Sequence, residues 1–174
     1  MKQFIETDLS KIAALAKVRE DENIRFRSFL KGCDDDVDKI VHRLHRDITS
    51  AIDCRQCANC CTVLKPEVKP KEIEQYARLE GISTAEYQDR YCEKGEFGDV
   101  SFKHLPCRYL DGKSCSIYEI RPQECRTYPH TQKKDFISRL WGMIDFYSVC
   151  PIVFNIMEDL KDEVRFRRGN RYRR

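Results

Sequence analysis

Apolar residues recur at helical spacing in the first part of the chain. Between residues 8 and 30, four apolar positions show this spacing: Leu9, Ile12, Ala13 and Ala16. Residues three and four apart lie on one face of a helix, so the pattern predicts a helix over residues 8–30. Asp8 stands just before it, where a carboxylate can accept hydrogen bonds from the first backbone N–H groups and cap the helix.

A second apolar stripe follows the acidic run at residues 34–36. Its members form one continuous face of a helix: Val37, Ile40, Val41, Leu44, Ile48 and Ile52. The acidic run suits the start of this helix, because the N-terminal end of a helix dipole favours negative charge. We expect the two helices to pack as an antiparallel pair over residues 1–53, which leads the chain to Cys54.

Shorter elements are predicted in the middle of the chain. A helix that follows Pro70 should end at Gly81, because glycine readily takes the left-handed conformation that closes a helix. Ser83 and Glu86 match a capping box, in which each side chain bonds to the backbone N–H of the other residue. A further helix is therefore predicted from Ser83 to about Cys92.

The later part of the chain mixes short extended pieces with helices. Within residues 99–118, Asp111-Gly112 predicts a tight hairpin turn. Pro122 and Pro151 predict the first turns of two helices, where proline is tolerated. The last helix carries an apolar stripe that should face the core: Val153, Ile156, Met157, Leu160 and Val164. The expected fold is mostly α with a small β-hairpin, a cysteine-rich metal-centred domain preceded by a helical pair.

Composition adds an unusual abundance of cysteine, with ten in 174 residues. The first eight residues lack the apolar stretch of a signal peptide, and no window approaches the apolar length of a membrane span. We therefore expect a cytoplasmic protein with no membrane partner. In that compartment, cysteines serve metal binding or redox chemistry more often than disulfides, although intracellular proteins of hyperthermophiles can be disulfide-rich.

The cysteines are densest at residues 54–61, where four thiols stand at C-x2-C-x2-C-C spacing: Cys54, Cys57, Cys60 and Cys61. Such thiols can converge on one small volume without help from distant parts of the chain. Closely spaced thiolates repel one another unless a cation neutralises them, so this density predicts metal binding. The alternative is buried cysteines without a metal, which is common for a single cysteine but not for four together.

Four further cysteines follow at wide intervals: Cys107, Cys115, Cys125 and Cys150. Four ligands are the usual complement of one zinc site or one iron–sulfur cluster, so eight allow two sites, or one site and a redox-active set. Structural zinc sites usually pair two C-x2-C knuckles, and the later cysteines form no second knuckle. The repeated C-x2-C spacing with a distant Cys-Pro resembles ferredoxin-type ligation. The spacing therefore favours an iron–sulfur cluster (4Fe–4S) over zinc, with zinc as the alternative cofactor.

Four segments together resemble the YkgJ-type cysteine-cluster family: residues 54–61, Pro106-Cys107, residues 115–129 and Cys150-Pro151. That family is described as a zinc- or iron-chelating domain, and the resemblance covers about residues 54–151. It implies eight metal-binding residues: Cys54, Cys57, Cys60, Cys61, Cys107, Cys115, Cys125 and Cys150. Cys33 and Cys92 lie outside the pattern.

Several cationic and aromatic residues stand near these cysteines in sequence. We hypothesise that Arg121 and Arg126 stabilise the negative charge of the thiolate centre as cofactor-binding residues; the alternative is ordinary surface or backbone contacts. Tyr118, Tyr128 and Trp141 are expected in the core, because aromatic side chains near a small metal site usually shield it.

The predicted organisation is a helical pair over residues 1–53, a metal-binding domain over 54–164 and a basic tail over 165–174. The tail holds six arginines and no acid, so it could contact phosphates, although terminal charge runs are more often solvated ends. The sequence has no phosphate-binding loop and no catalytic constellation apart from the metal cluster. Three classes follow: an iron–sulfur protein with a redox role or partner, a zinc-binding structural protein, and a module whose tail contacts RNA or a protein.

Overall fold

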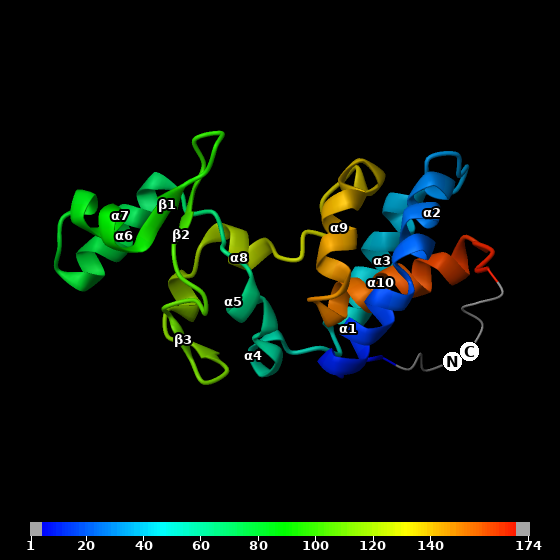
Figure 1. The fold of residues 1–174 in the computed structure, drawn as a ribbon, viewed down its shortest axis with the longest axis horizontal. Helices are drawn as coiled ribbons and strands as arrows, with labels where there is room; N and C mark the ends of the chain where they lie inside the picture. The colour runs from blue at the N-terminus through cyan, green and yellow to red at the C-terminus, as the bar shows by residue number, and fades with distance from the viewer. Residues whose placement is uncertain (1–4, 170–174) are drawn as a thin grey trace. The chain divides into compact units, whose positions relative to one another are not determined.

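The computed structural model describes residues 5–169, and most of this chain is helical (Figure 1). The described residues form ten α-helices, two short 3₁₀ helices and four short strands. By its contacts the chain divides into two compact units, unit 1 (Met1–Asp53 and Pro129–Arg174) and unit 2 (Cys54–Tyr128). The prediction of a mostly α fold with a small hairpin is confirmed. No helix among the described residues has both the length and the apolar character needed to cross a lipid bilayer.

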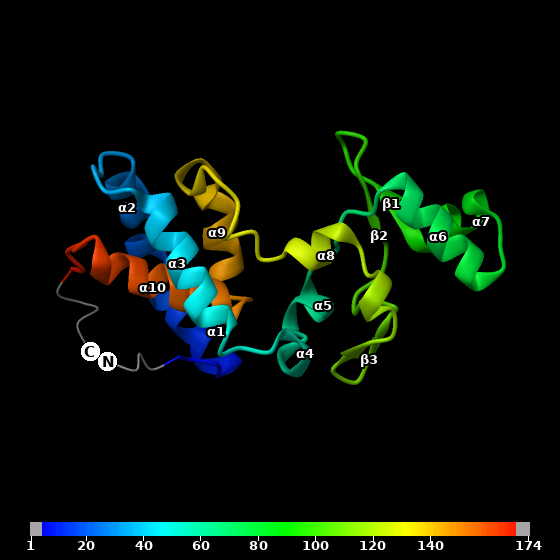
Figure 2. The ribbon, with the colours of Figure 1, turned by 180° about the vertical axis from the view of Figure 1, so that it is seen from behind.

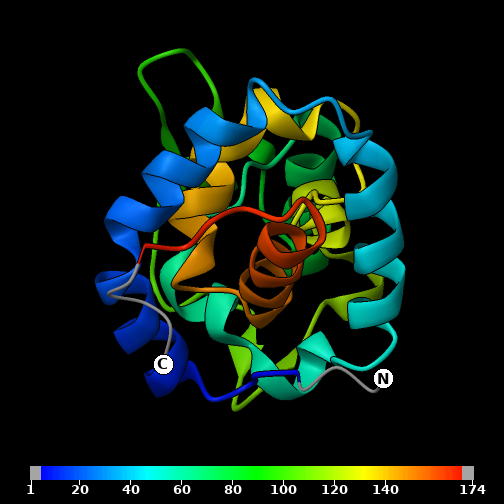
Figure 3. The ribbon, with the colours of Figure 1, turned by 90° about the vertical axis from the view of Figure 1, so that its right-hand side faces the viewer.

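Unit 1 is a bundle of helices whose middle is the last helix of the chain. Its elements are α1 (Leu9–Val18), α2 (Glu20–Leu30), α3 (Val37–Thr49), η2 (Phe136–Arg139), α9 (Leu140–Tyr147) and α10 (Pro151–Glu163). Figure 3 shows α10 (orange to red) in the middle of this unit, with α1 and α2 (blue) on one side and α3 (cyan) on the other. The first seven residues of α10 are all buried, as expected for a helix covered on every side.

The helix predicted over residues 8–30 is divided in two at Arg19. Asp8 caps α1 as predicted, and its carboxylate accepts hydrogen bonds from the backbone N–H groups of Ser10 and Lys11. Arg19 leaves the helical conformation (φ −101°, ψ 13°), and α2 then restarts with three acidic residues in its first turn. Negative charge at a helix N-terminus is favourable, so this acidic turn is the sequence signal for the break.

The most extensive helix contact of unit 1 joins α3 to α10, which lie across one another in Figure 2. The buried face of α3 is the predicted stripe, with Val37, Val41, Leu44 and Ile48 inside. We expected α3 to pack against the first helix. Its main partner is instead the final helix, because α10 offers a longer and more completely buried apolar surface.

Unit 2 is built from short elements. They are α4 (Cys54–Cys57), α5 (Asn59–Val63), α6 (Pro70–Glu80), α7 (Thr84–Tyr91), β1 (Cys92–Lys94), β2 (Val100–Phe102), β3 (Leu110–Asp111), β4 (Ser114–Cys115), η1 (Tyr118–Ile120) and α8 (Gln123–Thr127). The predicted hairpin is confirmed as β3–β4, with Leu110 opposite Cys115. A second antiparallel hairpin, β1–β2, pairs Cys92 with Phe102 and was not predicted.

Local sequence rules place most helix ends correctly. Gly81 closes α6 in the left-handed conformation, with φ 68°. The Ser83 hydroxyl accepts a hydrogen bond from the Glu86 backbone N–H and caps α7. Pro151 stands in the first turn of α10, and Pro122 immediately precedes α8. These ends orient the segments that carry the cysteines.

The core of unit 2 is mainly aromatic. Tyr76 lies centrally, with ring centroids 5.8 Å from Tyr109, 6.0 Å from Phe102 and 6.1 Å from Tyr87. The hydroxyl groups of Tyr87 and Tyr109 are 2.7 Å apart and share a hydrogen bond inside this cluster. Large rings give a unit of short elements much buried area, and the bonded hydroxyls avoid the cost of unpaired polar groups.

Candidate metal centre

Seven of the eight predicted metal ligands belong to unit 2, and Cys150 belongs to unit 1. No disulfide bond joins any two of the ten cysteines, all of which lie among the described residues. The ligands in unit 2 come from three regions of sequence: residues 54–61, residues 107–115 and Cys125 on α8. How the fold arranges these three regions decides which thiols can share a metal.

The first region folds into two short helices with a reversal between them. Cys54 and Cys57 bound α4, and Cys60 and Cys61 lie in α5. Ala58, at the join, takes a left-handed conformation with φ 53°, which is uncommon for a residue with a side chain. A hydrogen bond with the Cys60 thiol lowers the pKa of Cys61 to about 7, although burial opposes this shift.

The second region is tied to the first through the backbone. The Cys107 N–H donates to the Cys61 carbonyl oxygen at 2.8 Å, so these two residues are neighbours in space. Cys115 lies in β4, and β4 packs against α4. The β3–β4 hairpin thus folds back towards the cysteines of the first region.

Cys125 completes the group from α8. Burial, followed by the effects of the Cys61, Cys107 and Cys115 thiols, raises the pKa of its thiol to about 12. Burial also raises the pKa of Cys107, with contributions from Cys61 and Cys115, and the pKa of Cys115, with a contribution from Cys61. Every pair within this set is therefore close enough to interact electrostatically. We call Cys61, Cys107, Cys115 and Cys125 the four-thiol group.

Burial and the neighbouring thiols raise the pKa values of Cys107, Cys115 and Cys125 and so oppose thiolate formation there, whereas the Cys60 thiol lowers the pKa of Cys61. A bound cation reverses this preference, because it stabilises the deprotonated sulfur directly. Among the described residues, no three or more His, Cys, Asp or Glu side chains already stand in an arrangement that could hold a metal ion. The donor set fits a metal that prefers sulfur, such as zinc or the iron of an iron–sulfur cluster.

The remaining cysteines have other surroundings. Cys150 is buried at the N-cap of α10, where its backbone N–H donates to the Phe146 carbonyl at 2.8 Å. Its role as a ligand stays a prediction. Cys92 is buried at the start of β1, and the Cys33 thiol lies 3.3 Å from a carboxylate oxygen of Asp35.

The two arginines predicted to support the centre differ in their contacts. Arg121 is half-buried and lowers the pKa values of Cys115 and Cys125 against the larger effect of burial. Arg126 is exposed, and its Nε donates to the Arg121 carbonyl oxygen at 2.9 Å. Only Arg121 shows an electrostatic effect on the thiols, and Arg126 supports the backbone of Arg121.

The expectation for the aromatic residues needs one correction. Tyr118 and Tyr128 are half-buried, but Trp141 is 52% exposed and is not a core residue. Its ring lies 4.4 Å from the Arg27 guanidinium, which covers part of its surface. The helix α9 was not predicted, so the face of it on which Trp141 lies could not be predicted either.

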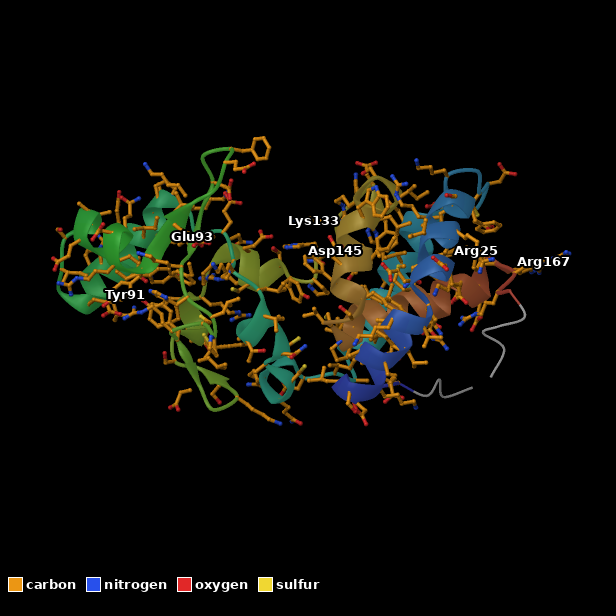
Figure 4. All side chains as sticks on the ribbon, in the orientation of Figure 1. Arg25, Tyr91, Glu93, Lys133, Asp145 and Arg167 are labelled. Carbon is orange, nitrogen blue, oxygen red and sulfur yellow. The ribbon has the colours of Figure 1, made fainter. Side chains whose placement is uncertain are left out.

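Sequence reasoning missed the cluster around Arg108, directly after Cys107. The Arg108 guanidinium carbon lies 3.7 Å from the ring centroid of Tyr91, which Figure 4 labels in unit 2. The same side chain donates to the Tyr109 hydroxyl at 2.8 Å and pairs with Glu80. These contacts hold the segment that carries Cys107 in place. The sequence signal for them was the pair Arg108-Tyr109, directly after the predicted ligand.

Comparison with known proteins agrees with this location of the site. The model of a family named CxxCxxCC, described as a "putative zinc- or iron-chelating domain", matches residues 53–142, more than half of the chain. The matched segment includes the whole of unit 2 and ends before Cys150. No curated protein and no solved structure gives a significant match.

Proposed function

The chain belongs to the CxxCxxCC family, and from this premise we propose that it is an iron–sulfur protein. Its domain is of a zinc- or iron-chelating kind, so metal binding is its general property. The more specific proposal is a 4Fe–4S cluster held by the four-thiol group. Such a cluster, when bound, supplies one-electron transfer or redox sensing.

One observation carries the proposal: four thiols from four different segments lie within electrostatic reach of one another. Cys61 comes from α5, Cys107 from the segment before β3, Cys115 from β4 and Cys125 from α8. Cys107 and Cys115 also pack against the aromatic core of unit 2. A junction of four thiols supplies the full ligand complement for one cluster.

The preference for iron–sulfur over zinc rests on the neighbouring C-x2-C-x2-C run at Cys54, Cys57 and Cys60, whose spacing resembles ferredoxin-type ligation. The four-thiol group itself contains no C-x2-C pair, a spacing that is usual in both structural zinc sites and ferredoxins. Cys54, Cys57 and Cys60 lie on α4 and α5, outside the four-thiol group, and their role as further metal ligands or redox thiols stays a prediction. The proposal also includes a cytoplasmic location and a redox partner, because free thiols persist in a reducing compartment.

A zinc-binding structural role is the second candidate. Four thiolates also match the tetrahedral complement of zinc, and the family description covers both metals. In either case the metal would contribute directly to the stability of unit 2.

The basic tail gives less support to a role in RNA binding. Within its described part, the Phe166 ring packs 5.0 Å from Phe26. The Arg168 guanidinium pairs with Glu158 and Asp162. These contacts fix part of the tail on unit 1. Residues 170–174, with three of the six arginines, lie outside the described residues.

The test is metal and acid-labile sulfide analysis of full-length protein prepared without oxygen. We expect a brown protein with iron and sulfide in equal amounts, and loss of both in Cys125→Ser. Cys33→Ser is the matched control and should retain the metal, because Cys33 lies in unit 1 outside the family pattern. A colourless protein with zinc and no sulfide would support the zinc alternative, and a protein with no bound metal would contradict both.

A further inference from the structure

Three polar side chains stand on one face of α6, the longest helix of unit 2. They are Glu72, Tyr76 and Glu80, each four residues after the one before. Residues four apart lie one above the other on the same face of a helix. Each of the three contacts a different segment of unit 2, and these segments carry or adjoin cysteines of the four-thiol group.

Glu72 holds the start of α8. The first N–H groups of a helix have no partner within that helix, and the N–H of Gln123, the first residue of α8, donates to Oε1 of Glu72 at 2.6 Å. The other carboxylate oxygen, Oε2, accepts from the Lys69 N–H at 2.8 Å, which fixes the carboxylate at the start of α6. Cys125 follows Gln123 by two residues in a helix of only five. Glu72 therefore anchors the short helix that carries Cys125.

Tyr76 holds the stretch of chain before α8. Its side chain is fully buried, and its hydroxyl donates to the Ile120 carbonyl oxygen at 2.8 Å. Ile120 ends η1, which lies in the sequence between Cys115 and Cys125. A buried tyrosine hydroxyl requires a hydrogen-bond partner, so this bond joins η1 to α6.

Glu80 acts on the segment of Cys107 through an arginine. Its carboxylate pairs with Arg108, which directly follows Cys107, and the two side chains are only 26% and 23% exposed. The Arg108 guanidinium also lies 3.7 Å from the Tyr91 ring centroid and donates to the Tyr109 hydroxyl at 2.8 Å. An ion pair, a stacked ring and a hydrogen bond leave this guanidinium little freedom, so the chain next to Cys107 is held in place.

The segments held in this way have little regular structure of their own. Cys107 lies between β2 and β3, and α8 is too short to be stable alone in water. Cys61 is joined to the same framework, because its carbonyl oxygen accepts the Cys107 N–H at 2.8 Å. The contacts with α6 therefore decide where these thiols lie.

We propose that α6 positions the ligands of the metal centre, with Glu72 holding the segment of Cys125 and Glu80 holding that of Cys107 through Arg108. Both glutamates are positioning residues, because each acts through another residue of the chain. This inference rests on the proposed function but not on the identity of the metal. Outer contacts that fix the ligands of a metal typically contribute 10- to 100-fold to its binding, on the order seen when such partners are removed.

The test is alkylation of single thiols, mapped by mass spectrometry, in full-length protein under anaerobic conditions with zinc in slight excess. A zinc-bound thiolate reacts only when its segment opens, so the rate at each thiol reports how firmly that segment is held. Glu72→Ala should raise the rate at Cys125 about tenfold relative to Cys107. Glu80→Ala should do the reverse and raise the rate at Cys107 about tenfold relative to Cys125.

This opposite selectivity separates positioning from a general loss of stability. Ser83→Ala is the matched control: it removes the cap of α7 in the same unit, so it should raise the rates of the four thiols together. Glu72→Gln and Glu80→Gln keep the side-chain length and one acceptor oxygen, and each should show a smaller rise at the same thiol as its alanine variant. Circular dichroism of the zinc-loaded variants identifies any that fail to fold, and the glutamine variant then decides the result.

The outcomes separate this inference from the proposed function. If the thiols of the wild type react at the same rate with and without zinc, the proposed function fails. If zinc protects the wild type, but each glutamate variant raises the rates at Cys107 and Cys125 equally or not at all, the positioning role of α6 alone is overturned.

Discussion

Units 1 and 2 bury charged and polar groups in different ways. In unit 1, Lys161 and Glu22 are both fully buried, and the Lys161 ammonium lies 2.8 Å from the Glu22 carboxylate. In unit 2, burial and neighbouring thiols raise the pKa values of Cys107, Cys115 and Cys125. Unit 1 thus neutralises its charges with charges of its own chain. In unit 2, the guanidinium groups of Arg108 and Arg121 oppose the rise in thiol pKa only in part, and we propose that a metal supplies the rest.

The ionic network of unit 1 is centred on Glu158 of α10. Its carboxylate accepts hydrogen bonds from Lys161 at 2.7 Å and from the Tyr147 hydroxyl at 2.6 Å. Arg19 and Arg168 pair with its other oxygen. The network joins α1, α9, α10 and the segment after α10. Together with the apolar faces of α3 and α10, it stabilises the interior of unit 1 with groups of its own chain.

Unit 2 has less regular structure to rely on. Its α4, α5 and α8 have four or five residues each, and β3 and β4 have two each. Helices this short are not stable by themselves in water. Four of these five elements carry predicted metal ligands, so a shared metal would join the weakest segments. We therefore expect the stability of unit 2, but not that of unit 1, to depend on metal.

Metal removal should produce the largest effect. A structural thiolate site contributes on the order of 10 kcal/mol to folding, so a chelator should unfold much of residues 54–128. Hydrogen exchange measured by mass spectrometry should show loss of protection there, while α3 and α10 keep theirs. Equal loss in both units, or no loss in either, would remove the contrast between them.

Replacement of Lys161 should have the next largest effect, confined to unit 1. Lys161→Ala leaves Glu22 buried without its cation and takes one of three cations from Glu158, which should lower the free energy of unfolding by about 3–5 kcal/mol. Fluorescence of Trp141, the only tryptophan and part of α9, reports the unfolding of unit 1. Bound metal should stay unchanged.

Lys11→Ala is the matched control for Lys161. The Lys11 side chain is 55% exposed and pairs with Glu6, so its loss should cost less than about 1 kcal/mol. Similar losses for the two variants would show that the buried network does not stabilise unit 1.

Acid should weaken unit 1 through Glu158. Burial alone would raise the pKa of this carboxyl group, but Lys161, Tyr147 and Arg168 outweigh burial and lower it from 4.5 to about 2. Because the folded pKa is the lower one, Glu158 stabilises the fold fully above pH 4.5 and loses this effect as the pH falls towards 2. The contribution is up to about 3 kcal/mol. Urea unfolding followed by Trp141 should show it, and Glu158→Gln should reduce the pH dependence.

Helix caps give the smallest effect and sharpen the comparison. The Asp36 carboxylate caps α3 by accepting a hydrogen bond from the Lys39 N–H at 3.1 Å, and Asp36→Ala removes this cap. Ser83→Ala removes the corresponding cap of α7. Each should cost about 1 kcal/mol. Hydrogen exchange should show that Asp36→Ala destabilises unit 1 both with metal bound and after its removal. The loss of stability caused by Ser83→Ala should be measurable only with metal bound, while unit 2 is folded. An equal effect of Ser83→Ala with and without metal would contradict this.

Local features of the fold could be predicted because few residues determine each of them. Asp8 caps α1, Gly81 closes α6 with φ 68°, and Pro151 begins α10, all as predicted from neighbouring residues. Such features depend on backbone conformation and on groups a few residues away. The break at Arg19 was missed although its acidic signal follows at once.

Packing between distant segments could not be predicted in the same way. The apolar stripes of α3 and α10 were both recognised, but nothing in either stripe identifies the other as its partner. The return of residues 129–174 to the N-terminal helices, which defines unit 1, depends on that match. The division expected from the sequence at residues 53/54 and 164/165 stays a prediction about folding units.

The candidate site shows the same contrast. The run at residues 54–61 is evident because its cysteines are adjacent, whereas the four-thiol group takes only Cys61 from that run. Its other members are separated by many residues and meet only through the folded chain. The assignment of all eight cysteines as ligands stays a prediction, and our proposal of one shared site concerns four of them.

We propose above all that one metal centre is held by the four-thiol group: Cys61, Cys107, Cys115 and Cys125. The most direct test is alkylation of individual thiols, mapped by mass spectrometry, in anaerobic full-length protein before and after chelation. We predict that these four thiols resist alkylation until the metal is removed, while Cys33 reacts equally in both states. Labelling of the four at the same rate with and without metal would contradict the account.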